Sequence, residues 1–320
     1  MNTYERFEYL EIEDSPVAVC DKHAPAETLT LSTCLSSRRL VIEQVIGKQG
    51  SRVGEFNCPA GLAVDRLGTL YVADSYNHRI QKITTDGKVT AIGSKGPGPG
   101  RFMNPQDIVV DNDLTMYVLE QGNNRLQKIT SEGRLDMIIG RRGRYPGEFA
   151  SPMGMSLDHE GNMYVADTGN SRLQKLGVNG LPLYSISSVK DRLLYGPQGV
   201  DVDSRGNTYV ADTFSHCIVK FDPMGREISR FGCRGHKPGM FDEPQDLAVD
   251  SYGYIYVIEM GNNRLQVFDT NASCTECVDG CSAIIGGLQS PTGIAIGPSG
   301  EVYIADTIHH RVIRMSWKTA

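Results

Sequence analysis

Residues 291–306 read Pro-Thr-Gly-Ile-Ala-Ile-Gly-Pro-Ser-Gly-Glu-Val-Tyr-Ile-Ala-Asp, two short apolar runs on either side of a glycine-bearing turn. Similar segments open with a proline at five earlier positions, which are Pro59, Pro105, Pro152, Pro197 and Pro244. The chain is therefore built from six copies of one unit, 45 to 47 residues apart. A period of about 40 to 50 residues, with several short strands per unit, is typical of a β-propeller rather than a helical solenoid.

Each unit has the composition of a four-stranded sheet. In the first unit, four runs rich in β-branched and aromatic residues are bounded by turn residues, at 62–64, 69–72, 79–83 and 89–92. No segment has sustained helical periodicity. We therefore predict an all-β fold of six four-stranded antiparallel blades.

The two ends of the chain complete each other. The last unit stops after three strand-like runs, whereas residues 39–47 match the fourth-strand segments of the other units. Gly47 precedes Pro59 by 12 residues, as Gly93 precedes Pro105. We predict that this N-terminal strand completes the sixth blade, which closes the ring and removes an exposed sheet edge.

Three segments share a signature around an Asn and an Arg, which are Ala73-Asp-Ser-Tyr-Asn-His-Arg-Ile-Gln81, Ala166-Asp-Thr-Gly-Asn-Ser-Arg-Leu-Gln174 and Asn262-Asn-Arg-Leu-Gln266. The signature resembles that of NHL repeats, which form six-bladed propellers, and the resemblance extends over residues 39–320. Residues 1–38 are then an N-terminal extension. WD-type repeats do not fit, because the one tryptophan, Trp317, lies outside any Trp-Asp pair.

Residues that recur from unit to unit are interpreted as scaffold. We expect two such series to pair with each other or with turn backbone, namely Asp74, Asp167, Asp212 and Asp306, and Arg79, Arg125, Arg172, Arg264 and Arg311. Histidine recurs at one equivalent position, as His78, His216 and His310. The NHL resemblance implies a structural role there rather than a three-histidine metal site.

Composition fits a well-packed domain, with 40% hydrophobic residues, 22% charged residues and a net charge of −6. The N-terminal residues are acidic and contain no apolar run, and no 18-residue apolar stretch occurs. We therefore expect no signal peptide, no transmembrane segment and a cytoplasmic location. In that compartment the eight cysteines are expected as thiols or metal ligands.

Related propellers include enzymes. Peptide-amidating lyases bind zinc through histidines that follow the strand-opening proline, and the corresponding residues here are Ala60, Gln106, Met153, Gln198, Gln245 and Thr292. None of them is a histidine, so the resemblance does not extend to that activity. Hydrolase, zinc-protease and phosphate-binding loop motifs are also absent from the sequence.

The second and fifth units depart from the others on the channel side. Asp107 and Asp246 stand where the other four units have glycine, and each follows a glutamine, Gln106 or Gln245. These units lie opposite each other in a ring of six, so we predict a cation or a basic ligand group at a channel mouth that also includes Gln198. The alternative is a three-blade duplication that left matched, solvated residues.

The loops that join one blade to the next are rich in cations although the chain is acidic. The predicted partner-binding residues are Arg141, Arg142, Arg144, Lys95, Arg101, Arg234 and Lys237. Such a face attracts acidic protein surfaces or phosphate. Some NHL domains bind single-stranded RNA, but aromatic residues for base stacking are sparse in these loops, so a protein partner in a complex is favoured over RNA.

Three cysteines, Cys274, Cys277 and Cys281, lie within eight residues, in what we expect to be a loop of the fifth blade. Together with Cys34, or alternatively Cys20, they are candidate ligands of zinc or an iron–sulfur cluster. The sequence thus predicts a non-catalytic protein-binding or scaffold subunit. The alternatives are a redox or electron-transfer component, or an enzyme subunit, that depends on these cysteines, and an RNA-binding propeller.

Overall fold

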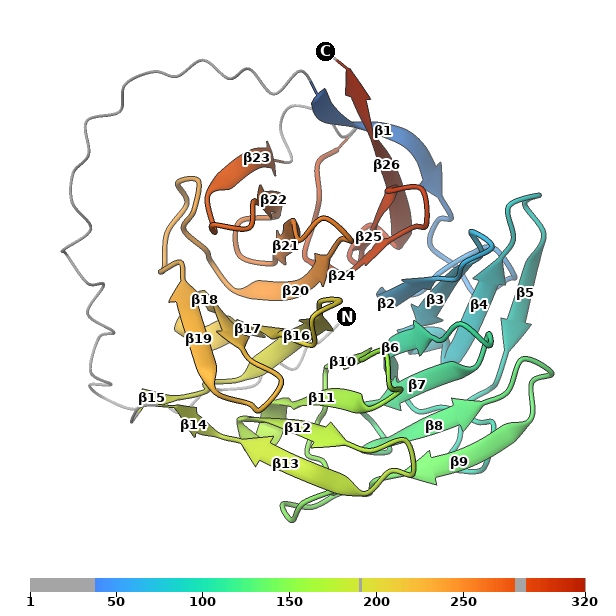
Figure 1. Ribbon diagram of the computed structural model, residues 1–320. Helices are drawn as coiled ribbons and strands as arrows, with labels where there is room; N and C mark the ends of the chain where they lie inside the picture. Colours follow the sequence, from blue (N-terminus) through green and yellow to red (C-terminus); the bar gives the residue numbers. More distant parts are fainter. Residues whose placement is uncertain (1–37, 190–191, 280–285, 320) are drawn as a thin grey trace, which may run out of the picture. The chain divides into compact units, whose positions relative to one another are not determined.

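The computed structural model describes residues 38–189, 192–279 and 286–319, and Figure 1 shows them as six antiparallel sheets around a central axis. Each sheet has four strands, and we number the blades 1 to 6 in the order of the strand-opening prolines. The predicted six-bladed propeller is confirmed. No helix among the described residues is long and apolar enough to cross a membrane.

Within each blade the chain runs from the axis outward. The inner strands are β2 (Pro59–Val64), β6 (Pro105–Val110), β10 (Gly154–Leu157), β16 (Pro197–Val202), β20 (Pro244–Val249) and β24 (Pro291–Ile296). The second strands are β3 (Leu70–Asp74), β7 (Met116–Glu120), β11 (Met163–Asp167), β17 (Thr208–Asp212), β21 (Ile255–Glu259) and β25 (Val302–Asp306). The third strands are β4 (Arg79–Ile83), β8 (Arg125–Ile129), β12 (Arg172–Leu176), β18 (Cys217–Phe221), β22 (Arg264–Phe268) and β26 (Arg311–Thr319).

The outer strands are β5 (Val89–Ile92), β9 (Leu135–Ile139), β13 (Pro182–Ile186), β19 (Glu227–Phe231), β23 (Cys274–Asp279) and, in blade 6, β1 (Arg38–Ile46). A small hairpin, β14 (Ser188–Val189) with β15 (Arg192–Leu193), precedes blade 4. Short 3-10 turns follow three second strands, as η1 (Ser75–Asn77), η2 (Thr168–Asn170) and η3 (Thr213–Ser215).

The N-terminal strand closes the ring as predicted. β1 pairs antiparallel with β26, from Arg38 opposite Thr319 to Ile46 opposite Val312, with one irregularity between Ile42 and Gln44. Leu40 of β1 is buried in the core between blades 5 and 6. The pairing gives the outer edge of β26 a partner, so no long third strand is left open.

Hydrophobic cores lie between neighbouring blades, and four phenylalanines seal them from the connecting loops. Phe56, Phe102, Phe149 and Phe241 are fully buried. The ring of Phe56 lies against Gly47, whose φ is +81°, and a Cβ on that glycine would be 2.3 Å from the ring. Glycine is therefore required both for the backbone conformation and for the space.

Two faces of the propeller follow from this chain path. We call the side where the inner strands begin the loop face, and its connections between blades include residues 47–58, 93–104, 140–151, 187–196 and 232–243. The opposite side, where the inner strands end in short turns such as Asp65–Thr69, is the turn face.

Candidate functional site

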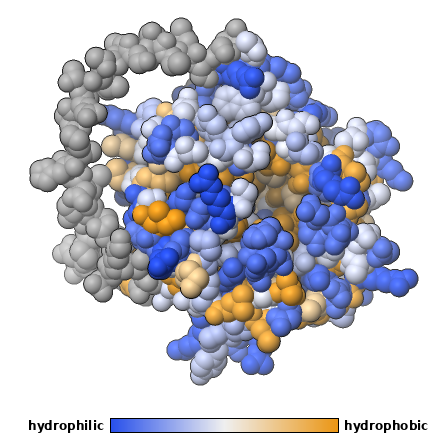
Figure 2. All heavy atoms as spheres, in the orientation of Figure 1, coloured by the Kyte–Doolittle hydropathy of each residue, from blue (hydrophilic) through white to orange (hydrophobic). Residues whose placement is uncertain are grey.

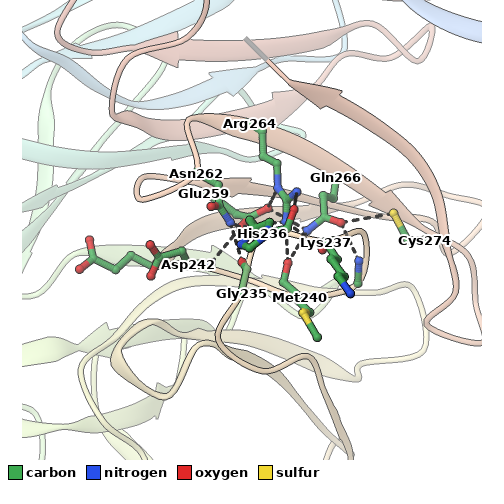
Figure 3. A network of polar contacts seen from close by, with 12 residues as sticks. Gly235, His236, Lys237, Met240, Asp242, Glu259, Asn262, Arg264, Gln266 and Cys274 are labelled. Carbon is green, nitrogen blue, oxygen red and sulfur yellow. Dashed lines mark hydrogen bonds and ion pairs between the residues drawn. The ribbon is translucent and has the colours of Figure 1, made fainter. Parts of the chain in front are cut away.

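A buried ionic network fixes the connecting loop in five of the six blades, and Figure 3 shows the one in blade 5. Glu259 is fully buried and accepts hydrogen bonds from the backbone N–H of Asp242 (2.9 Å) and from Gln266 (2.8 Å), and it pairs with Arg264. The Arg264 guanidinium also donates to loop carbonyls, including that of Met240 at 2.7 Å. The loop that leads into blade 5 is therefore fixed to the sheet by side chains.

The same network recurs in four other blades. The ion pairs are Asp74 with Arg79 (2.7 Å), Glu120 with Arg125 (2.6 Å), Asp167 with Arg172 (2.7 Å) and Asp306 with Arg311 (2.6 Å). In blades 1, 2 and 3 the arginine also donates to carbonyls of the preceding loop. The interpretation of these acidic and arginine series as scaffold is confirmed.

The three equivalent histidines connect neighbouring blades. The Nδ1 atoms of His78, His216 and His310 accept hydrogen bonds from backbone N–H groups of the next blade, at 3.1, 3.1 and 3.0 Å. Each histidine serves a different blade boundary. Their role is structural, as the resemblance implied.

The loop face presents exposed cations, most of which form no ion pair with a described residue. All seven predicted partner-binding residues are exposed. Two have an acidic neighbour, because Arg141 pairs with Glu148 at 2.9 Å and Arg234 lies 3.7 Å from Asp242. Five form no ion pair with any residue in the described part of the chain, namely Lys95, Arg101, Arg142, Arg144 and Lys237.

Few aromatic side chains accompany these cations. The phenylalanines of the connecting loops are buried in the cores, which leaves Tyr76 (57% exposed), Tyr145 (71% exposed) and Tyr195 (58% exposed) on this face. The ring of Tyr195 also packs edge-on against Phe214. A face that binds unpaired bases needs several exposed rings in succession.

The channel residues lie in the wall of a narrow constriction. Its lining includes the five predicted channel residues, Gln106, Asp107, Gln198, Gln245 and Asp246. The Asp107 carboxylate accepts a hydrogen bond from the backbone N–H of Met155 in blade 3 (2.7 Å), and Asp246 accepts one from Ile294 in blade 6 (3.1 Å). Each carboxylate therefore also bridges two blades.

Sequence reasoning missed a third carboxylate, Asp201. It accepts hydrogen bonds from the Ser156 hydroxyl and from the Val249 N–H, each at 2.8 Å. Asp201 lies four residues after its strand-opening proline, where Asp246 lies two after its own, and alternate strand residues share a face. Burial is the main cause that raises the pKa of all three carboxyls, and neighbouring aspartates raise it further.

The cysteine cluster is placed differently from the prediction. Cys274 and Cys277 lie on β23, the outer strand of blade 5, and not in a loop, because Val278 is buried against Leu265 and continues the sheet. Burial raises the pKa of both thiols. Cys34 and Cys281 lie outside the described residues, which contain no group of three metal-binding side chains.

Comparison with known proteins supports the fold assignment. The NHL repeat model matches residues 56–83, 194–221 and 288–314, in blades 1, 4 and 6. No curated protein matches the chain.

Several solved structures share the architecture. One is a streptogramin B lyase, with 12% identity and a TM-score of 0.62 over 88% of this chain and 98% of that one. An inactive virginiamycin B lyase from Staphylococcus aureus with quinupristin has 14% identity and a TM-score of 0.62, over 87% and 99%. A gluconolactonase from Xanthomonas campestris has 15% identity and a TM-score of 0.63, over 88% and 98%. At these identities the likeness concerns the fold alone.

Proposed function

Because the chain is an NHL-repeat six-bladed β-propeller, we propose that it is a non-catalytic binding subunit whose loop face docks an acidic surface of a partner protein. The observation that supports this most is the set of five exposed cations without an ion pair in the described residues. Unpaired cations on one face accelerate the encounter with an acidic surface and orient it.

The loops that carry these cations are organised before binding. Lys237 belongs to the loop fixed by Arg264, and Arg144 to the loop fixed by Arg172, whose guanidinium donates to the Arg144 carbonyl at 2.8 Å. A fixed loop loses little conformational entropy when a partner binds, so more of the contact energy remains as affinity.

An acidic protein surface is favoured over RNA as the ligand. The three exposed tyrosines, Tyr76, Tyr145 and Tyr195, belong to segments of different blades, and the phenylalanines of the connecting loops are buried. Charge attraction alone gives binding without base recognition, whereas an acidic protein surface needs only complementary charge and shape.

Charge reversal tests this proposal. Arg141, Arg142 and Arg144 are replaced together by glutamate, and the control carries Lys88→Glu, Arg134→Glu and Arg205→Glu, three exposed residues in turns of the turn face. Both variants change the net charge equally. Affinity capture with cross-linking from the source cells should yield an acidic protein with wild type and control but not with the loop-face variant.

Two readouts make the outcome specific. Capture should weaken as salt rises from about 50 to 500 mM, because surface charge interactions are screened. A labelled oligouridylate should bind wild type no better than double-stranded DNA of equal length. Capture unaffected by the loop-face variant and by salt would contradict the proposal, and selective binding of the single strand would favour the RNA alternative.

The cysteines support a second proposal, in which Cys34, Cys274, Cys277 and Cys281 bind zinc or an iron–sulfur cluster. Its support is the thiol spacing, together with the position of Cys274 and Cys277 on one outer strand that ends at Asp279, two residues before Cys281. Such a centre would make the protein a redox, electron-transfer or enzyme subunit. Metal analysis of anaerobically purified protein tests it.

A further inference from the structure

One buried polar atom in the central channel has no partner. Gln245 is 5% exposed, and its side-chain amide donates to Oε1 of Gln198, which is 8% exposed. The Oε1 atom of Gln245 accepts no hydrogen bond from any described residue. The constriction that it lines has a volume of about 10 Å³, enough for one group the size of a water molecule. A buried oxygen without a donor is unfavourable, so this position favours a hydrogen-bond donor or a cation.

Carboxylates surround the same position. Asp107 and Asp246 line the constriction from opposite blades, and Asp201 lies on the adjoining wall. Their hydrogen-bond partners are backbone N–H groups and the Ser156 hydroxyl, and none forms an ion pair with a described residue. No lysine or arginine is among the described residues that line the channel. The channel therefore gathers three carboxyl groups and other hydrogen-bond acceptors without a positive group.

Beyond the constriction the channel widens toward the turn face. This cavity has a volume of about 210 Å³ and shares Asp107 and Asp246 with the constriction, so the two spaces adjoin at these residues. Apart from the three aspartates and Ser156, its lining is aliphatic, with residues such as Val64, Val110, Val249 and Ile296. A ligand that fits it has a charged head and an apolar stem.

We propose that the channel binds an alkylammonium group from the turn face. The ammonium lies between the carboxylates of Asp107, Asp201 and Asp246, directs a proton toward Oε1 of Gln245, and leaves its methylene stem against the aliphatic wall. An ammonium has three donors, and a carboxylate has about four acceptor positions, so backbone bonds leave capacity at each aspartate. A four-carbon stem like that of lysine suits the cavity.

The geometry favours an ammonium over a bare metal ion. Backbone N–H groups of blades 3, 5 and 6 hold the carboxylates of Asp107, Asp201 and Asp246, and no three acidic, histidine or cysteine side chains of the described residues converge as metal ligands do. Metal ions need ligand oxygens within about 2.6 Å, whereas ammonium hydrogen bonds accept longer and more varied distances. The inference does not depend on the loop-face proposal, because it concerns the opposite side of the ring.

Calorimetric titration of the full-length protein tests the proposal. The probes are n-butylamine, its uncharged counterpart n-butanol, and calcium chloride. Butylamine should bind with one site per chain, while butanol at the same concentrations should not bind. Two further probes identify the source of the group: Nα-acetyl-lysine N-methylamide represents a partner's lysine side chain, and spermidine represents a free polyamine. The probe that binds more tightly identifies the source of the ammonium group.

Variants place the bound amine in the channel. Asp246→Asn should weaken butylamine binding about tenfold or more, because a charge-assisted contact is lost. Asp250→Asn, which removes the same charge from the neighbouring turn of blade 5, should change the affinity less than about twofold. If Asp246→Asn does not fold, the wild-type titration alone decides. No heat from butylamine up to about 10 mM, equal binding of butanol, or binding of calcium but not of butylamine overturns the proposal.

Discussion

Blades 4 and 5 are neighbours with the same four-stranded sheet, yet they hold their incoming loops differently. In blade 5, Arg264 pairs with Glu259 across β21 and β22 and also binds loop carbonyls. In blade 4, Cys217 occupies the arginine position, and Arg230 from the outer strand reaches Asp212 instead, at 3.1 Å. The Nε atom of Arg230 is buried without a partner.

The loops explain this difference. The loop into blade 5 turns on Gly232 and buries Phe241, and its carbonyls point to Arg264. The loop into blade 4 contains the β14–β15 hairpin, which supplies its own backbone pairing, and Leu194 replaces the phenylalanine in the core. An arginine therefore stands on the third strand where the incoming loop has carbonyls for it to bind. Blade 4 shows that the four-stranded sheet forms without this arginine. The cationic loops of the proposed binding face are of the first kind.

Opening the ring should have the largest effect on stability, because blades 4 and 5 both depend on the closed array of sheets. Deleting residues 1–50 removes β1 and exposes β26, and should lower the free energy of unfolding by roughly 5 kcal/mol or cause aggregation, through lost strand pairing and burial of Leu40. Deleting residues 1–37 keeps β1 and serves as the control. Equal melting temperatures of the two truncations would contradict the closure.

Replacing Arg264 and Arg230 separately by alanine compares what each arginine contributes to stability in its blade. Arg264→Ala should cost about 3–5 kcal/mol, because Glu259 is left buried and unpaired and three loop carbonyls lose a donor. Arg230→Ala should cost about 1–3 kcal/mol, because Asp212 keeps the hydrogen bond from Tyr195 and its pKa is already raised by burial. Urea unfolding of both variants measures the difference.

A faster hydrogen exchange in loop 232–243 of Arg264→Ala, with no matching change in loop 187–196 of Arg230→Ala, would support the loop explanation. Equal losses of stability with unchanged loop exchange would show that the arginines stabilise the sheets and not the loops.

The fold could be predicted from the sequence because the same unit occurs six times along the chain. The six prolines locate the blades, and the matching spacing of Gly47 and Gly93 before their prolines locates the closing strand. Each copy of a repeated unit supports the assignment of the other copies. The position of Cys274 and Cys277 was predicted wrongly, because cysteine spacing carries no sign of the buried Val278 that extends β23. Sequence also gave no signal for Arg230, whose partner Asp212 is 18 residues away on another strand.

The channel was predicted only in part. Asp107 and Asp246 were found because they break a glycine pattern, and the structure shows why the pattern exists: a Cβ on Gly61 would lie 2.5 Å from the Cα of Asp107. Asp201 breaks no such pattern. The Oε1 atom of Gln245 is left without a partner because the side-chain amide of Gln245 donates to Gln198 of the neighbouring blade. Such a contact between blades cannot be predicted from the sequence of one strand.

The pH dependence of stability distinguishes the two blades more finely. Burial raises the folded-state pKa of Asp212, so its contribution to stability is full below its unfolded value near 3.8 and is lost as the pH rises through the folded value. Asp212→Asn should remove this loss of stability as the pH rises above the unfolded value near 3.8. Asp222→Asn is the control, because hydrogen bonds lower the pKa of that carboxyl and its contribution has the opposite pH dependence. Identical pH profiles of wild type and Asp212→Asn would contradict the assignment.

The smallest expected effect on the fold concerns the cysteines that blade 5 carries on its outer strand and blade 4 lacks there. If the proposed metal or cluster is present, Cys274→Ser and Cys277→Ser should each remove it, whereas Cys217→Ser and Cys233→Ser should not. Elemental analysis and absorption spectra of anaerobic protein measure this. Absence of zinc and iron from wild type, or a metal content untouched by Cys277→Ser, would rule the site out.

We propose that the fixed, cationic loops of the loop face form the partner-binding surface. Hydrogen–deuterium exchange of the propeller, measured alone and with the acidic partner that the wild type captures, tests it most directly. We expect slower exchange in loops 93–104, 140–151 and 232–243 on binding, with the turns after the inner strands unchanged. Protection confined to the turn face, or to the outer strands, would contradict it.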